Sequence, residues 1–258
     1  LSPFPGRITV DPKGVNFDNS LPREIGPYLS WAKKTNNFDS WSKVTAQIKQ
    51  RQSKKPLLSI EQKDLLDQPF CFLPLQVPGD SQLRLFGGEF KTVEAVIEAA
   101  ANGARALPDG WHVRIKEHPS ACRSFKDLID KHSHPKLVLD NTTDTFKQVR
   151  LSRAVVTVNS SVGLEAMFFE KPVIVLGQCF WSIPHVAIKC ENRESLEHLL
   201  KTPEQLSFDI KARGAFLSFL TEIYYPKLAA CGAAMLTEET IKIRRRLVSG
   251  GQFNGWFS

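Results

Sequence analysis

The stretch Ala154–Gly177, AVVTVNSSVGLEAMFFEKPVIVLG, decides the fold of this chain. It opens with a β-branched apolar run, Ala154–Val158, which is too short for a stable helix and typical of a strand buried on both faces. After a polar break, apolar residues recur at helical spacing over Val162–Phe169, and a second apolar run follows at Val173–Leu176. The stretch therefore predicts a strand, a short helix packed on the sheet, and a second strand parallel to the first.

The polar turn inside this unit is the first candidate site. Asn159, Ser160 and Ser161 prefer helix caps to helix interiors, and Gly163 leaves space for a ligand to approach the backbone. The free N–H groups and the positive dipole end of the helix would favour a phosphate or a carboxylate. An ordinary crossover, whose serines only cap the helix, is an equally weighted interpretation.

On both sides of this unit, short apolar strands alternate with amphipathic helices. The further predicted strands are Phe70–Leu75, Trp111–Lys116, Leu137–Leu139 and, at an edge, Val186–Ile188. The further predicted helices are Thr92–Ala106, Phe125–Lys131, Thr143–Leu151 with caps at Asn141 and Thr142, and Ser195–Leu200. This alternation predicts an α/β fold: a Rossmann-like parallel sheet with helices on both faces. Gln76–Gly88 is predicted to be a long polar loop.

Residues 1–68 do not resemble a complete domain, and the region after position 206 is predicted to be helical. Ile8–Phe17 predicts a strand–turn–strand hairpin whose turn lies at Asp11–Gly14. The helices predicted outside the alternating region are Tyr28–Lys34, Trp41–Arg51 and Phe216–Tyr225, the last being one of two or three helices over residues 207–248.

The composition is that of a globular protein. Hydrophobic residues make up 42% and charged residues 24% of the 258 positions, and no stretch approaches the ~20 apolar residues of a membrane-spanning helix. The five cysteines are odd in number and lack CxxC spacing, which favours buried free thiols in a reducing cytoplasm over disulfides or a zinc site. Because the chain begins at Leu1 without a leader pattern, we interpret it as processed, truncated or renumbered.

The charge balance indicates an anionic partner. The net charge is +7, the pI is near 9.2, and Lys242–Arg246 is the densest basic cluster. A solvated helix face is the default interpretation of that cluster, and attraction to an anionic membrane surface is the sharper one. Nucleic acid is not expected as a partner, because the other basic residues are dispersed and no nucleic-acid module is present.

Three predicted strands are followed by polar residues whose side chains could bind a ligand or take part in a reaction. These strand ends are Gln76–Gln82, Lys116–Pro119 and Asn159–Ser161. In a doubly wound sheet, ligands bind beyond the carboxyl ends of the strands, so we expect the three ends to converge. Their convergence is more informative than any one of them alone.

Two of these strand ends suggest specific chemical roles. Lys116 and His118 are two adjacent donors suited to a phosphate, and His118 could also donate a proton; the plainer interpretation is a His bonded to backbone. Asp80 lies among Gln76 and Gln82, where a carboxylate can act as nucleophile, base or stabiliser of an oxocarbenium-like centre.

Two further interpretations stay open. Asp80 would, in the simpler case, only form an Asx turn after Gly79. Glu165 is placed to reach a ribose hydroxyl from its helix, and a solvated helical glutamate is the equally weighted alternative.

Three blocks of sequence, taken in order, form a recognisable set. They are FLPLQVPGDSQ at Phe72–Gln82, IKEHP at Ile115–Pro119, and VNSSVGLEA with KPVIVLG at Val158–Ala166 and Lys171–Gly177. The set resembles the capsule polysaccharide biosynthesis family, which includes bacterial transferases of β-linked Kdo, an acidic eight-carbon sugar. The resemblance covers roughly residues 69–178, about two-fifths of the chain.

The resemblance implies a GT-B-like glycosyltransferase, built of two facing Rossmann-like domains, that uses a CMP-activated sugar without an obligatory metal or other cofactor. It implies that Lys116, His118, Ser160 and Ser161 lie at the nucleotide phosphate. In members that retain configuration a carboxylate is the nucleophile, and Asp80 is the residue carried over. His118 and Asp80 are thus the expected catalytic residues.

The expected domains follow from this resemblance. They are a partial N-terminal and linker region (residues 1–68), a nucleotide-sugar-binding domain (69–205) and a C-terminal helical segment (206–258). The expected partners are a CMP-sugar donor, a glycan or glycolipid acceptor and an anionic membrane surface, which places the protein in the cytoplasm, peripheral to the inner membrane. A nucleotide-sugar epimerase and a non-catalytic binding subunit are the alternatives.

Overall fold

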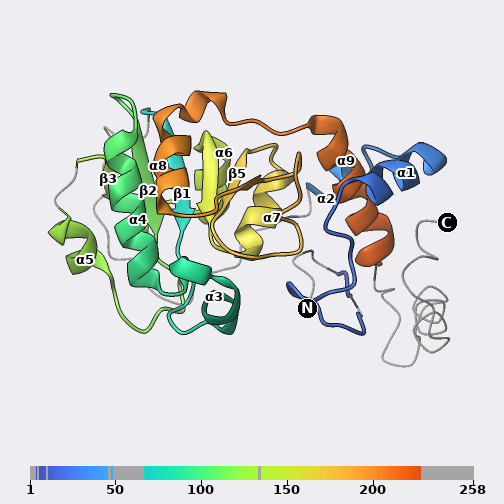
Figure 1. The fold of residues 1–258 in the computed structure, drawn as a ribbon, viewed down its shortest axis with the longest axis horizontal. Coiled ribbons are helices and arrows are strands. Elements are labelled where there is room, and N and C mark those ends of the chain that lie inside the picture. Colours follow the sequence, from blue (N-terminus) through green and yellow to red (C-terminus); the bar gives the residue numbers. More distant parts are fainter. Residues whose placement is uncertain are drawn as a thin grey trace. The chain divides into compact units, whose positions relative to one another are not determined.

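The computed structural model describes residues 4, 6–9, 11–45, 48, 67–132 and 135–227 (Figure 1). The chain forms two compact units. One comprises Leu1–Ile48, Phe180–Val186 and Asp209–Ser258, and the other comprises Lys49–Cys179 and Ala187–Phe208. The described residues before position 49 and after position 208 therefore group in one unit, whereas the sequence prediction assigned them to separate segments.

The second unit is built on a six-stranded parallel sheet. Its strands are β1 (Phe70–Pro74), β2 (His112–Lys116), β3 (Leu137–Leu139), β4 (Ala154–Thr157), β5 (Val173–Val175) and β6 (Ile188–Lys189). Their order is β3-β2-β1-β4-β5-β6, and every neighbouring pair is parallel. This is the Rossmann strand order, in which the chain reverses direction of travel between β1 and β4. The α/β, Rossmann-like prediction is confirmed.

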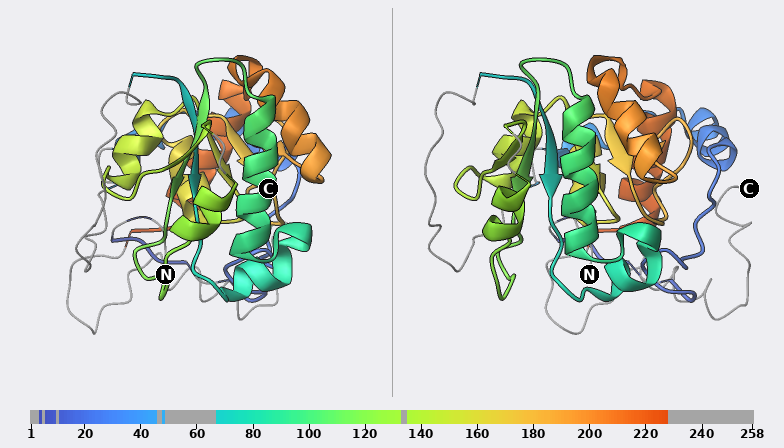
Figure 2. Two further views of the ribbon diagram at one scale, coloured as in Figure 1. Left: turned by 90° about the vertical axis from the view of Figure 1, so that its left-hand side faces the viewer. Right: turned by 60° about the vertical axis from the view of Figure 1, so that its left-hand side comes forward.

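Helices cover both faces of the sheet (Figure 2). On one side lie α4 (Val93–Ala106), α5 (Lys126–Lys131) and α8 (Arg193–Lys201), and on the other lie α6 (Thr145–Leu151) and α7 (Ser161–Met167). The Thr92 side chain caps α4 by accepting from the Ala95 N–H at 3.1 Å. Helix α4 packs closely on α8 because Gly103 has no Cβ, which would lie 2.7 Å from Leu200 Cδ1. One apolar core joins this face of the sheet to α4 and α8.

The segment predicted as the polar loop Gln76–Gly88 is partly helical, so that prediction is wrong. It contains α3 (Ser81–Phe86), followed by a 3₁₀ turn at Gly88–Phe90. Two features explain the helix: Asp80 caps its first turn, and Leu83 is buried beneath it. Pro74 ends β1 at the exit of the sheet and not at an edge, since β1 is central.

Two caps and one edge strand also differ from expectation. Helix α6 begins at Asp144, whose side chain accepts from the Lys147 N–H at 2.7 Å; Asn141 and Thr142 do not cap it. The edge strand β6 begins at Ile188, where the predicted edge strand was to end.

The first unit is helical and aromatic in its described part. It contains α1 (Gly26–Thr35), α2 (Ser42–Thr45) and α9 (Ile210–Phe219), which continues as a π-helical turn at Leu220–Tyr224. The Tyr28 ring packs edge-on against both Phe216 and Phe219, at centroid distances of 5.1 and 5.3 Å. The helices predicted at Tyr28–Lys34 and Phe216–Tyr225 are thus confirmed in substance.

The predicted N-terminal hairpin is wrong among the residues described. Its turn exists, because the Gly14 N–H donates to the Asp11 carbonyl at 3.2 Å, but positions 15–17 form bends and a turn and no strand. The Asp11 carboxylate instead accepts from Ser20 N–H and Oγ, which draws the chain into a loop. Ile48 is not helical, so the helix predicted at Trp41–Arg51 is reduced to α2; most of its second half lies outside the described residues.

Some predictions fall where the structure describes nothing. Lys242–Arg246, Cys231 and the polar linker after position 49 all lie outside the described residues. Within the described ranges, none of the helices combines the length and apolar character required to cross a bilayer.

Candidate functional site

A cavity of about 330 Å³ opens beyond the carboxyl ends of β1 and β2. It is lined by Pro74, Leu75, Lys116, Glu117, His118, Pro119, Ser120, Thr145, Phe146, Ser160, Ser161, Val162 and Glu165. Its volume lies in the range of small-molecule sites, and its position is where doubly wound sheets bind ligands. The structure therefore brings together two of the three polar strand ends predicted to converge, those after β2 and β4.

Lys116 is the buried cation of this cavity. Its Nζ donates to the Asn141 and Thr143 carbonyls, both at 2.8 Å, so two of its three N–H groups are used by the loop after β3. Burial lowers the pKa of Lys116, and the carboxylates of Asp140 and Asp144 oppose that effect. These two carbonyls leave one N–H group of Lys116 over, and the residue lines the cavity.

His118 is exposed and has a defined tautomer. Its Nδ1 accepts from the Ser120 N–H at 3.1 Å. In the neutral ring the proton must then reside on Nε2, which makes that atom a donor. The bond to backbone expected of a plain structural histidine is present, and it also prepares the other nitrogen for donation.

The turn before α7 acts first as a helix cap. The Ser160 Oγ accepts from the Val162 N–H at 3.3 Å, and its carbonyl accepts from the Gly163 N–H at 3.0 Å. Gly163 is buried within α7 and does not line the cavity, whereas the exposed Ser161 does. The capping interpretation thus describes Ser160, and two N–H groups expected to bind an anion are already used.

Glu165 is 4% exposed and lines the cavity, so it is not a solvated helical glutamate. Its neighbour in the same cavity, Glu117, has a structural role. The Glu117 carboxylate accepts from Ser124 Oγ at 2.9 Å, from Asn141 Nδ2 at 2.8 Å and from the Phe125 N–H. Glu165 is therefore a buried acidic residue on α7 that contributes to the cavity wall.

A second polar cluster joins the ends of β1 and β4, at the point where strand order reverses. Its members, Gln76, Asp80, Gln82 and Asn159, are here called the switch-point cluster. The Gln76 Oε1 accepts from the Asn159 N–H at 3.2 Å, and its Nε2 donates to Asn159 Oδ1 at 2.9 Å. The Asn159 Nδ2 then donates to the Gln82 carbonyl at 2.9 Å. All these residues come from the predicted site, and the structure brings them together.

Asp80 lies within this cluster and not in the wall of the cavity. Its Oδ1 accepts from the Gln82 N–H at 2.9 Å, which is the Asx-type cap of the simpler interpretation, assisted by Gly79 at φ +80°. Its Oδ2 lies 3.4 Å from Gln76 Nε2, which donates to it. One carboxylate oxygen is thus structural, and the other is oriented by an amide.

Helix α3, which Asp80 caps, is fixed to the sheet at Gly177. A Cβ there would lie 2.7 Å from the Phe86 carbonyl oxygen and 2.7 Å from Val158 Cγ1. The next residue, Gln178, donates its N–H to the same Phe86 carbonyl at 2.7 Å. The last turn of α3 is therefore bonded to the chain leaving β5.

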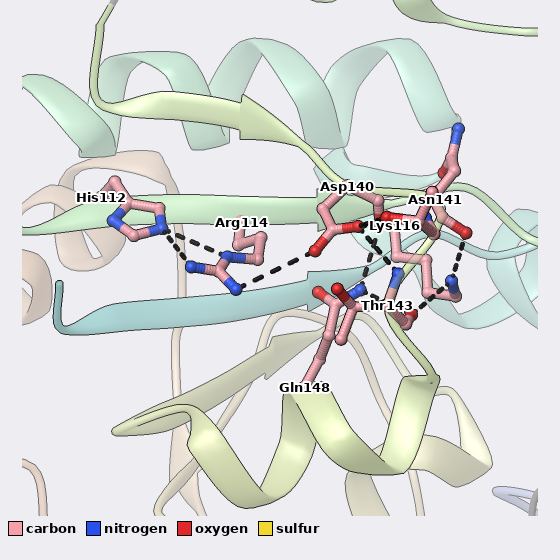
Figure 3. A network of polar contacts seen from close by, with 8 residues as sticks. His112, Arg114, Lys116, Asp140, Asn141, Thr143 and Gln148 are labelled. Atoms are coloured by element: carbon pink, nitrogen blue, oxygen red, sulfur yellow. Dashed lines mark hydrogen bonds and ion pairs between the residues drawn. The ribbon is translucent and has the colours of Figure 1, made fainter. Parts of the chain in front are cut away.

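The sequence prediction missed a network of charged and polar groups behind Lys116 (Figure 3). The Arg114 guanidinium stacks on Phe70 at 3.8 Å, donates to His112 Nε2 at 3.2 Å and faces Asp140 at 3.9 Å. We call His112, Arg114, Lys116 and Asp140 the buried charged cluster. Its sequence signal was a fourth polar strand end, Asp140–Thr143, which was taken for a helix cap.

Two further features concern the possible metal ligands and the cysteines of the described residues. No group of three or more His, Cys, Asp or Glu side chains there is arranged to hold a metal ion. Cys71, Cys179 and Cys190 are buried and Cys122 is exposed, and none of these four forms a disulfide. Burial raises the pKa of Cys71 to about 12, so its thiol is inert at neutral pH.

The fold defines a Rossmann-like domain with a cavity beyond the carboxyl ends of its strands. The chain matches the family described as capsule polysaccharide biosynthesis protein over residues 40–209. This protein therefore belongs to the capsule polysaccharide biosynthesis family, as its three sequence blocks indicated.

Two relatives extend this result. Protein FixF of Sinorhizobium fredii is 32% identical over 224 residues, which cover 87% of this chain and 52% of FixF. The capsule polysaccharide export protein KpsS of Escherichia coli is 27% identical over 150 residues, which cover 55% of this chain and 37% of KpsS. The chain thus spans about half, or less, of the length of these curated relatives.

Among solved structures, the chain resembles Thermosulfurimonas dismutans KpsC, beta Kdo 2,7 transferase. The TM-score is 0.53 at 16% identity, and the match covers 95% of this chain and 73% of that one. At this identity the likeness concerns the fold, and it agrees with the GT-B-like architecture expected from sequence.

Proposed function

We propose that this chain contributes to a glycosyltransferase that moves an acidic sugar of the Kdo type from a CMP-sugar donor during capsule polysaccharide biosynthesis. The observation that supports this most is the cavity of about 330 Å³ that contains Lys116, His118 and Ser161. Membership of the family gives the biosynthetic setting. The acceptor would be a glycan or glycolipid, reached from the cytoplasmic side of an anionic inner membrane.

The cavity suits the departing nucleotide. When the bond between sugar and CMP breaks, negative charge develops on the phosphate, and preorganised donors stabilise it. The third N–H of Lys116 and the Nε2–H of His118 are such donors, and both groups line the cavity. The Ser161 hydroxyl adds a neutral donor, and the buried Glu165 carboxylate is suited to accept from ribose hydroxyls.

The switch-point cluster suits the sugar. A retaining transfer needs a carboxylate that attacks the anomeric carbon as CMP leaves and that is displaced in turn by the acceptor hydroxyl. Asp80 is oriented by Gln76 through one oxygen in the segment that follows β1, and Pro74 and Leu75, at the end of β1 and directly after it, line the cavity. The reaction proposed here draws on these side chains and on no metal or cofactor.

The proposal is tested first at the level of the donor. Calorimetry with CMP, UDP and GDP should show that CMP binds at least tenfold more tightly than the other two. Equal binding of UDP would favour the epimerase alternative, and CMP binding without transfer would favour a non-catalytic subunit; either outcome contradicts the transferase proposal.

The binding is tested next at Lys116. Lys116→Met should weaken CMP binding by about tenfold or more, because a charge-assisted hydrogen bond of about 1.5–3 kcal/mol is lost. Lys126→Met, an exposed lysine on α5, is the matched control and should leave the affinity unchanged. Thermal unfolding of both variants shows whether each remains folded at the assay temperature.

A further inference from the structure

We infer that Asp140 is a positioning residue for Lys116: it shapes the loop whose carbonyls hold the Lys116 ammonium at the cavity. The inference deepens the proposed function, and it rests on that function only in treating Lys116 as the group that binds the anionic ligand. The geometry itself concerns Asp140, the loop and Lys116.

The Asp140 carboxylate folds the loop that follows β3. Its Oδ1 accepts three hydrogen bonds, from the Thr142 N–H at 3.0 Å, from Thr142 Oγ1 at 2.9 Å and from the Thr143 N–H at 2.9 Å. Its own N–H donates to the Ile115 carbonyl at 2.8 Å, which ties the loop to β2. A single side-chain oxygen therefore determines the path of the chain over Asp140–Thr143.

That path places two carbonyls around the Lys116 ammonium. The oxygens of Asn141 and Thr143 each lie 2.8 Å from Lys116 Nζ (Figure 3). The Gln148 Nε2 supports the arrangement from α6 by donating to the Asp140 and Thr143 carbonyls, both at 3.0 Å. Without Asp140 the carbonyls would not be directed at Lys116, and the ammonium would lose two of its partners.

The charge of Asp140 matters as well as its shape. Burial raises the pKa of Asp140, but the hydrogen bonds from Thr143 and Thr142 outweigh it, so the net pKa is lowered and the group is an anion at neutral pH. Its Oδ2 faces Arg114, which is 1% exposed, at 3.9 Å. The same negative charge opposes the lowering of the Lys116 pKa by burial.

Several other titratable groups surround Lys116 and enter the design of the test. They are Asp144 at the start of α6, Glu117 and His118 at the end of its own strand, Arg114 on that strand, and Glu165 on α7. Among these groups and Asp140, Asp140 is the one that both accepts hydrogen bonds from Thr142 and Thr143 and contributes negative charge at Lys116. A control must therefore change a carboxylate outside this set.

The first measurement is the pH profile of Lys116 itself. Amine acetylation is followed by peptide mass spectrometry at a series of pH values, which gives the midpoint of Lys116 deprotonation. Asp140→Asn should move this midpoint to lower pH and raise the labelling rate at pH 8 about three- to tenfold, because each unit of pKa changes the free-amine fraction about tenfold. Asp109→Asn, an exposed carboxylate paired with Lys136, is the control and should leave the midpoint unchanged.

The second measurement is CMP binding in a double-mutant cycle. Asp140→Asn should weaken CMP binding at least fivefold in the native background and less than twofold in a Lys116→Met background, because Asp140 acts through Lys116. If Asp140→Asn does not fold, Thr142→Val replaces it; this variant removes one donor to Asp140 and should cost two- to fivefold only when Lys116 is present.

The outcomes separate this inference from the proposed function. An unchanged Lys116 midpoint in a folded Asp140→Asn protein, or equal losses of affinity in both backgrounds, would overturn the positioning role. Absence of CMP binding by the native chain would contradict the proposed function, and the Lys116 midpoint would still decide the role of Asp140.

Discussion

The switch-point cluster and the buried charged cluster lie at neighbouring strand ends of one sheet, yet they are built from opposite materials. The first fixes a single carboxylate with neutral amides, while the second sets two cations against one carboxylate and one histidine. Amide side chains orient a neighbouring group through hydrogen bonds without adding charge. Buried ions produce a strong electrostatic field, but burying them costs desolvation free energy. The proposed transfer separates charge, so it needs an oriented carboxylate at the sugar and a group of fixed charges at the leaving phosphate.

The hydrogen-bond directions are also more fully determined in the switch-point cluster than in the buried charged cluster. The Asn159 backbone N–H can only donate, so it fixes Oε1 of Gln76, and each later donor and acceptor follows from that choice. In the buried charged cluster, Arg114 Nη1 lies 3.9 Å from Asp140 Oδ2, which is longer than a hydrogen bond. The stability of the buried charged cluster should depend on pH through His112, because burial and the nearby Arg114 lower the pKa of this residue.

The largest effect is expected from a substitution that removes the nucleophile of the switch-point cluster and keeps the shape of the cluster. Asp80→Asn should reduce sugar transfer by about 10³-fold or more, because an amide cannot act as the nucleophile. CMP affinity should stay within a few-fold, and the helix cap should survive because Asn caps as well as Asp. Intact-protein mass spectrometry with the donor sugar would show a glycosyl adduct on the native chain and none on the variant.

The matched control for this variant is Asp209→Asn. Asp209 caps α9 in the first unit, accepting from the Ala212 N–H at 2.8 Å, and it undergoes the same chemical change in the same structural role. It should leave transfer unchanged. Near-native turnover by Asp80→Asn would show that this carboxylate is a turn residue and nothing more.

An effect of intermediate size is expected for His112 of the buried charged cluster, which should make the stability of the fold depend on pH. Burial, and then the nearby Arg114, lower the pKa of His112 to about 4. The unfolded chain binds a proton near pH 6.5 while the folded chain does not, so stability falls as pH falls from about 6.5 to about 4. The loss attributable to His112 is about 3 kcal/mol.

Urea unfolding of the native chain and of His112→Gln at pH 7, 6, 5 and 4 measures this loss. The difference in unfolding free energy between the two proteins should change over that range in favour of the variant. A difference that stays constant with pH would mean that His112 is protonated in the folded chain or titrates normally.

The smallest effect is expected from a substitution that removes hydrogen bonds from the switch-point cluster. Asn159→Ala removes the side-chain partners of Gln76 and Gln82 and should cost about 2 kcal/mol of unfolding free energy, at every pH from 5 to 8. Transfer should fall with it, because the amide that orients Asp80 loses its own partner. Asn192→Ala, which removes the cap of α8, should cost a comparable amount with no change in transfer. If both variants lose transfer alike, stability and not orientation is the cause.

Much of the fold followed from local pattern. The apolar runs around Ala154–Gly177 predicted β4, α7 and β5 to within about two residues at each end, because buried parallel strands show continuous apolar sequence. The polar residues after β2 and β4 were correctly expected to meet, since carboxyl ends share one edge of a parallel sheet. Which residue chemistries face the cavity could thus be inferred in part from order alone.

The missed features depend on tertiary contacts. Helix α3 is six residues long, and its stability comes from burial of Leu83 and from the bond at Phe86, which no local pattern specifies. Arg114 sits in an alternating strand and would ordinarily face water, but Phe70 and His112 enclose it. The role of Asp140 could not be separated from helix capping, because Asp, Asn and Thr serve both turns and caps.

The strand order has a kinetic consequence. Strands β1 to β3 come from one continuous stretch and β4 to β6 from the next, and the seam between the two halves joins residues far apart in sequence. The Gln76–Asn159 bonds that close this seam span 83 positions, so their formation must wait for the ordering of a long loop. During synthesis the half carrying Asp80, Lys116 and His118 emerges first and has no partner for Gln76 until β4 follows. The assembled site is therefore a late product of folding, and the nascent chain exposes a sheet edge until that moment.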